Sequence, residues 1–148
     1  MHITRIAEMD TQATYELIFS HMSESELSTF RAINPEAHQA VIDILNNKYG
    51  ICFVAKRHDV VIGYLMAANR FTDTGAIKYA ELRDIRVRKD YQNKGVGSLL
   101  VKEFISWAKV EGYERLCVDV YALNDKNIGF YQKFGFVPKT LTMERWFR

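Results

Sequence analysis

Apolar and polar positions along this chain of 148 residues change period several times, and the period predicts the elements. Positions 2–7 (HITRIA) alternate one by one, which is typical of a strand. Positions 11–20 are predicted to form a helix, with Asp10 as its N-cap. Positions 23–33 are rich in Ser and Glu, and both a loop and a short helix remain open.

The next segments predict a helix followed by a β-hairpin. Asn34-Pro35 is a helix start signal, and we expect the helix to continue to Asn47. Its expected buried positions are Ala37, Val41, Ile44 and Leu45. Positions 51–56 and 60–68 are apolar and β-prone, and the short turn at 57–59 joins them into a hairpin. Positions 71–76 are expected to form a loop.

The second half of the chain alternates strands and helices. Positions 78–87 alternate over ten residues and predict one long strand. Positions 95–111 give the clearest helix, which Gly112 is expected to end. Its apolar positions at helical spacing are Val96, Leu99, Leu100, Phe104, Trp107 and Ala108. A strand at 115–121, a helix at 124–134 closed by Gly135 and a last hairpin within 136–147 complete the prediction.

This order predicts an α/β protein with a mixed, mostly antiparallel central sheet flanked by helices, and a single domain over residues 1–148. Hydrophobic residues make up 48% of the chain, which is too much for intrinsic disorder. The net charge of +2 gives no strong pull toward nucleic acid or membrane. Because the two cysteines are far apart in sequence and form no CxxC pair, we expect no metal site and a reducing, cytoplasmic location. The first ten residues carry no long apolar stretch, so we expect neither a signal peptide nor a membrane span.

A glycine-containing loop between the predicted strand and the clearest helix is the main chemical signal. It consists of Gln92, Asn93, Lys94, Gly95, Val96 and Gly97. The helix N-terminus that follows offers unpaired N–H groups and a positive dipole end to a phosphate. A Walker loop is excluded because Gly97 is followed by Ser98 and Leu99, and a Rossmann fingerprint fails at the large Leu100. The pattern Gln/Arg-x-x-Gly-x-Gly/Ala fits, although the glycines could simply turn the chain.

A second segment, at 124–136 (NDKNIGFYQKFGF), carries Asn124 and Tyr131 seven residues apart, on one helix face. Together with the glycine loop, it resembles the Gcn5-related N-acetyltransferase (GNAT) superfamily over residues 78–138. Asn127 departs from the alanine that the family often has there. Asn124 could also be an ordinary N-cap, and Tyr131 an ordinary core residue.

The resemblance implies an enzyme that transfers an acetyl group from acetyl-CoA to a primary amine. It implies that the backbone of Ile85, Arg86 and Val87 grips the pantetheine arm, and that the amides from Gln92 to Ser98 hold the pyrophosphate. Asn124 and Tyr131 would also contact CoA, with Tyr131 donating a proton to the departing thiolate.

By the same resemblance Glu81 is the expected general base, eleven residues before Gln92. On a regular strand it shares its face with Arg83, Ile85 and Val87, whereas Asp84 would point to the opposite face. A surface ion pair with a nearby arginine is an equal alternative for Glu81, and relatives often use a chain of water molecules instead.

The sequence does not identify the acceptor, which could be a small amine, an aminoglycoside, an amino acid, or a protein N-terminus or lysine. Acidic residues that could attract a cationic amine are Glu24, Glu26, Glu36 and Asp43, which could equally form a solvated face. A non-catalytic acyl-CoA sensor or structural module is the alternative from another class, and a general nucleotide-binding domain is a third. A homodimer is a further expectation.

Overall fold

The structure is a computed structural model that describes residues 1–72 and 74–147. It divides into two compact units, Met1–Val118 and Asp119–Arg148, which are described separately below. Unit 1 contains one sheet and the helices that cover it. Unit 2 contains one helix and a long segment without regular structure.

A five-stranded sheet in the order β1-β2-β3-β4-β5 forms the centre of unit 1. Its strands are β1 (His2–Arg5), β2 (Gly50–Arg57), β3 (Val60–Phe71), β4 (Lys78–Val87) and β5 (Arg115–Val118). The first four strands pair antiparallel, and β4 pairs with β5 in parallel. The predicted fold class, a mixed and mostly antiparallel sheet flanked by helices, is therefore confirmed.

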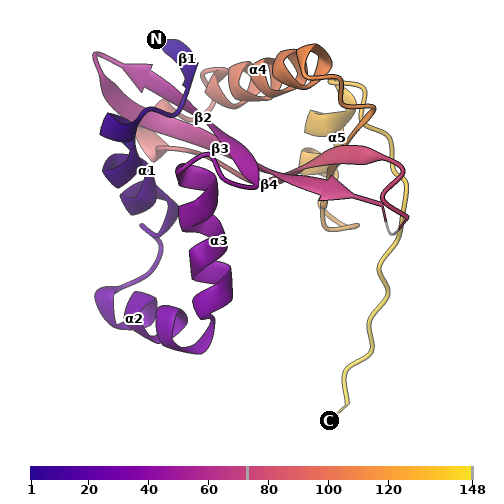
Figure 1. The fold of residues 1–148 in the computed structure, drawn as a ribbon, viewed down its shortest axis with the longest axis horizontal. Coiled ribbons are helices and arrows are strands. Elements are labelled where there is room, and N and C mark those ends of the chain that lie inside the picture. Colours follow the sequence, from indigo (N-terminus) through magenta and orange to yellow (C-terminus); the bar gives the residue numbers. More distant parts are fainter. Residues whose placement is uncertain (73, 148) are drawn as a thin grey trace. The chain divides into compact units, whose positions relative to one another are not determined.

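Helices cover both faces of this sheet (Figure 1). The α-helices of unit 1 are α1 (Thr11–Ile18), α2 (Glu24–Ile33), α3 (Pro35–Leu45) and α4 (Val96–Val110), and short 3-10 turns lie at Glu8–Asp10 and Lys89–Tyr91. On one face, Ile18 of α1 and Ile44 of α3 belong to the same buried cluster as Tyr64 of β3. On the other face, Trp107 of α4 lies edge-on to Phe53 of β2.

Most predicted elements are confirmed, and some details were wrong. Segment 23–33 is helical from Glu24 because the Ser23 hydroxyl accepts the Glu26 amide at 3.1 Å. Ala37 is exposed, since it lies on the first turns of α3, and the core contacts come from the C-terminal end of that helix. Leu99 is likewise exposed on α4, where Val101 is buried instead. Strand β5 ends at Val118, three residues before the predicted end at Tyr121.

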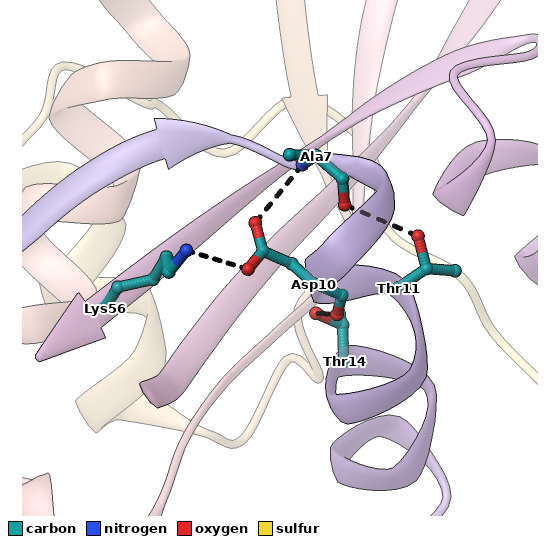
Figure 2. Close-up of polar contacts among 5 residues, drawn as sticks. All are labelled: Ala7, Asp10, Thr11, Thr14 and Lys56. Atoms are coloured by element: carbon teal, nitrogen blue, oxygen red, sulfur yellow. Dashed lines mark hydrogen bonds and ion pairs between the residues drawn. The ribbon is translucent and has the colours of Figure 1, made fainter. Parts of the chain in front are cut away.

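The Asp10 side chain has a different role from the predicted helix N-cap. Asp10 stands at the N-cap position of α1, but its carboxylate makes no capping hydrogen bond. Figure 2 shows that it instead pairs with Lys56 of β2 at 2.8 Å and accepts the Ala7 amide at 3.3 Å. Both charged side chains are almost fully buried, so the opposite charge of Lys56 outweighs the weaker capping interaction.

Unit 2 contains α5 (Asp125–Gln132), which begins at the predicted place. The Asn124 side chain caps it by accepting the Asn127 amide at 3.1 Å, and Gly135 follows it with a positive φ of 89°. The predicted hairpin within 136–147 was wrong, because the structure assigns no strand to those residues. Apolar positions there suggested strands, but a strand also needs a partner whose identity the local pattern does not contain.

Candidate functional site

One edge of β4 is open where the sequence predicts the pantetheine arm. Pairing with β5 stops at Leu82–Val118, whereas pairing with β3 continues to Val87. Arg88 donates its amide to Ile62 of β3 at 2.8 Å. Because backbone groups alternate sides along a strand, Arg86 also faces β3, and Ile85 and Val87 face the open edge. An added extended chain could therefore bond to Ile85 and Val87.

A β-bulge in β4 changes which side chains share a face. Met66 of β3 pairs with Asp84 and Ala67 pairs with Leu82, so Arg83 is skipped by the register. Residues opposite each other point to the same face of a sheet. Asp84 therefore shares a face with Glu81, which lies opposite Ala68, and Ile85 points to the other face. The expectation that Glu81 shares its face with Ile85, and that Asp84 points away, was wrong because it assumed a regular strand.

The glycine loop forms a sharp entry into α4. Asn93 and Gly95 have positive φ values of 60° and 83°, and Gly95 is the N-cap residue. At Gly95 the positive φ is the constraint, because a Cβ would meet no atom within 4 Å. Leu99 is the first residue whose amide bonds back to Gly95, at 3.1 Å. The amides of Val96, Gly97 and Ser98 thus precede the hydrogen-bond ladder of the helix, as an anion site requires.

Gln92 ties this loop to the end of β4. Its side-chain amide donates to the Val87 carbonyl oxygen at 2.9 Å. That bond occupies the carbonyl of Val87 and leaves its N–H for a ligand. The predicted strand and loop residues are thus adjacent within unit 1, and Gln92 acts there through its side chain.

Two cations lie beside the loop around the ring of Tyr91. The Lys94 ammonium lies 5.7 Å from the ring centroid, and the Arg57 guanidinium lies 5.9 Å from it. Lys94 was predicted from the motif, whereas Arg57 comes from the end of β2 and has no local sequence signal. Both side chains are exposed, so they can add positive charge near an incoming phosphate.

The side chain of Arg86 stabilises the C-terminal end of α1. Its guanidinium donates to the carbonyl oxygens of Leu17 at 3.3 Å and Ile18 at 3.2 Å, and contacts Nδ1 of His21 at 3.3 Å. These bonds satisfy carbonyl groups that a helix end leaves without partners. Arg86 therefore fixes α1 against the strand beside the open edge.

Glu81 is engaged by two arginines. Its Oε1 accepts from Arg83 at 2.8 Å, and its Oε2 lies 3.7 Å from Nε of Arg70. This matches the ion-pair alternative that the sequence left open.

Tyr131 and Asn124 lie in unit 2, on α5. Tyr131 is buried, with its ring 5.1 Å from that of Phe130 and 5.7 Å from that of Phe136. The Asn124 side chain caps the helix, which is the ordinary N-cap role that the sequence analysis gave as one alternative. Their contacts with CoA remain predictions.

Cys52 is unsuited to nucleophilic chemistry. Burial, and after it the charges of Asp10 and Asp84, together raise the pKa of its thiol to about 12. The thiol therefore stays protonated and takes no part as an acyl carrier near neutral pH.

Over residues 1–72 and 74–147 no helix has the length and apolar character needed to cross a membrane.

Unit 1 is thus an α/β fold in which an open strand edge leads into a glycine loop and the N-terminus of α4. Comparison with known proteins gives the family. The model of the acetyltransferase (GNAT) family matches residues 15–136, and the chain belongs to that family. The family resemblance and the enzyme class predicted from the sequence, an acetyltransferase, are thereby confirmed.

Two curated relatives match parts of the chain. Streptothricin acetyltransferase A of Bacillus subtilis (strain 168) is 39% identical over 59 residues, which are 40% of this chain and 34% of that protein. N-acetyltransferase 8B of Homo sapiens is 27% identical over 88 residues, which are 59% of this chain and 39% of that protein. The matched stretches thus span little more than a third of the length of these relatives.

Solved structures share the fold over nearly the whole chain. Aminoglycoside N-acetyltransferase AAC(6')-Iy in complex with CoA has a TM-score of 0.71 and 17% identity, covering 99% of each chain. AAC(6')-IG from Acinetobacter haemolyticus has a TM-score of 0.69 and 24% identity, covering 100% of each chain. At these identities the likeness shows the fold alone.

Proposed function

We propose that the protein is an N-acetyltransferase that transfers an acetyl group from acetyl-CoA directly to a primary amine of a small molecule or peptide. The observation that carries the proposal is the open edge at Ile85 and Val87 leading into the amides of residues 96–98. Family membership and a fold neighbour with bound CoA support it. No metal is assigned a role.

The proposed donor site takes CoA along this path. The backbone of Ile85 and Val87 holds the pantetheine arm as an added strand. One free N–H polarises the thioester carbonyl. The loop amides hold the pyrophosphate, with Lys94 adding charge.

The chemical step in this proposal needs a proton donor for the leaving group. Tyr131 gives its phenolic proton to the CoA thiolate as the carbon–sulfur bond breaks. A phenol suits this role because its ordinary pKa near 10 keeps it protonated until a strong base forms beside it. We further propose that both units act as one acetyltransferase domain, since the family match spans residues from each.

The acceptor class is proposed from the similar proteins. Streptothricin and aminoglycoside acetyltransferases are both named for small cationic amines, and we propose a small molecule of that class. We propose the cytoplasm as its location, consistent with two free cysteines. A homodimer stays a prediction.

A thiol-release assay tests the function. Purified protein with acetyl-CoA should release CoA when a cationic amine is added, from a panel of sisomicin, streptothricin, small alkylamines and a lysine peptide. Release with an amine and formation of its amide support the proposal. Binding of acetyl-CoA without release on any of these amines would instead support the non-catalytic acyl-CoA sensor.

A further inference from the structure

A cleft of about 410 Å³ lies in unit 1, lined by residues of α1, the turn before β3, the start of β3 and Arg88 after β4. No step of the proposed acetyl transfer uses these residues. We propose that the cleft binds a free α-amino acid with an apolar side chain. The inference goes beyond the proposed function, because this binding needs neither CoA nor an acceptor.

Part of the lining is apolar and can receive the side chain of such a ligand. Val61 is buried and Leu17 is half-buried, while Ala13 and Val60 are exposed, with 50% of the Val60 surface open to solvent. An apolar ligand side chain packed there would remove both surfaces from water. The volume of the cleft also falls in the range of small-molecule sites, about 300–1,000 Å³.

Two opposite charges of the lining have no partner. Across residues 1–72 and 74–147, the side chains of Asp59 and Arg88 make no hydrogen bond or ion pair, either with each other or with another group. An ammonium can pair with Asp59 and a carboxylate with Arg88. A free α-amino acid carries both groups on one carbon, whereas a simple amine or a simple carboxylate satisfies only one of the two charges.

The other carboxylates of the lining are already engaged. Asp10 is paired with Lys56 at 2.8 Å (Figure 2), and Oε1 of Glu16 accepts from the Gln12 side chain at 3.0 Å. Asp59 is therefore the carboxylate that is left for the ammonium of a ligand.

Arg88 also connects the cleft to the glycine loop. Its amide donates to the Ile62 carbonyl oxygen at 2.8 Å, and its own carbonyl oxygen accepts the Tyr91 amide at 2.8 Å. Tyr91 directly precedes Gln92, the first residue of the loop. A ligand that holds the Arg88 side chain thus restricts the backbone that leads into the proposed pyrophosphate site.

NMR titration of the 15N-labelled protein with L-leucine tests the site. We expect saturable shifts at the amides of Leu17, Val60 and Val61, with a dissociation constant of about 1 mM or lower. Three compounds each remove one part of the ligand: leucinamide the carboxylate, 4-methylpentanoate the ammonium, and glycine the apolar side chain. Each should bind at least about tenfold more weakly than leucine.

Two variants assign the ends of the ligand. Arg88→Met should abolish the preference for leucine over leucinamide, and Asp59→Asn should abolish the preference for leucine over 4-methylpentanoate. Asp59 has a positive φ of 63°, which Asn tolerates, and Arg88→Met keeps the backbone bonds of Arg88. Glu16→Gln, in the same cleft, is the matched control and should bind leucine within about twofold of the wild-type protein.

The link to the loop has its own measurement, which rests on the proposed function. Saturating leucine should lower the dissociation constant of acetyl-CoA about threefold, and acetyl-CoA should tighten leucine by the same factor. Arg88→Met should remove this effect. An acetyl-CoA affinity that leucine leaves unchanged would overturn the link between the cleft and the loop.

The contrary results for the site itself do not involve CoA. Absence of saturable shifts up to about 20 mM leucine, or equal binding of leucine and the three compounds, would overturn the amino-acid site. A preference that survives in both Arg88→Met and Asp59→Asn would do the same. Failure of the wild-type protein to bind acetyl-CoA would instead contradict the proposed function and leave the leucine titration as an independent result.

Discussion

At the scale of single residues, the skipped register position at Arg83 decides which side chains of β4 share a face of the sheet. One extra residue in β4 turns Asp84 to the face of Glu81 and leaves Ile85 on the other face. The sequence around Arg83 contains no glycine or proline that would signal such a bulge. Regular alternation was therefore the natural expectation, and it failed where the pairing with β3 shifts.

Tyr131 gives the first prediction. Tyr131→Phe should lower kcat by about 100-fold, because the thiolate loses its proton donor, while the dissociation constant of acetyl-CoA stays within about twofold. Steady-state kinetics and calorimetry measure the two quantities. Tyr121→Phe, at an exposed position of the same unit, is the matched control. Equal losses in turnover and affinity would remove the proton-donor role.

The buried pair of Asp10 and Lys56 gives a stability prediction. Asp10→Asn keeps an acceptor for the Ala7 amide but leaves the Lys56 ammonium buried without its counter-charge. We expect the free energy of unfolding to fall by about 3 kcal/mol, measured by urea denaturation. Adding Lys56→Met should recover part of the loss.

The control for this pair is Glu103→Gln, a similar charge removal on the exposed face of α4. It should change the free energy of unfolding by less than about 0.5 kcal/mol. If Asp10→Asn changed the free energy of unfolding by as little, water would have to screen the charges of Asp10 and Lys56.

At the scale of elements, the aromatic cluster of α1, α2 and α3 contains a titratable group. Nε2 of His38 lies 2.9 Å from the Tyr15 hydroxyl, and its ring packs 5.7 Å from that of Phe19 and 6.4 Å from that of Phe30. Burial lowers the pKa of His38, and the Arg31 charge lowers it further. The folded protein thus favours the neutral imidazole.

The lowered pKa of His38 makes the folded protein less stable at acidic pH. Because the unfolded chain binds the proton more readily, the stabilisation is fully present above the ordinary pKa of 6.5 and is lost as the pH falls below it. We expect Tm to drop between pH 7.5 and 5.5, with His38 contributing on the order of 1 °C. His38→Gln should remove that contribution, and the exposed His2→Gln should not.

Element boundaries were predictable wherever the pattern was strong. The alternation at 78–87 and the spacing at 95–111 each correspond to one observed element, β4 and α4. Strand pairing was harder to predict from the sequence, because the partner of a strand lies elsewhere in the chain. That is why Arg57 beside the loop was missed, and why 136–147 was assigned a hairpin that the structure does not contain.

At the scale of the whole molecule, the strand and loop that we propose as the donor site carry a sequence motif, whereas no motif marks an acceptor site. The loop and the strand before it are contiguous in sequence, so a short motif could place them together. Contacts between distant elements, such as Tyr64 with Asp84 and Arg86 with Ile18, join residues that lie far apart in the sequence. Shape and side-chain contacts of that kind have no local signature.

Calorimetric titration with acetyl-CoA, of the wild-type protein and of Gly97→Trp, tests the central claim most directly. Gly97 lies in the first turn of α4 between Val96 and Ser98, so a bulky side chain there should compete with a pyrophosphate bound at these amides. Lys102→Trp, on the exposed face of the same helix, is the control, and thermal melts verify that both variants fold. We predict micromolar binding by the wild-type protein and Lys102→Trp, and a loss of at least about 100-fold in Gly97→Trp. Equal affinities in a folded Gly97→Trp protein, or no binding by the wild-type protein, would contradict the account.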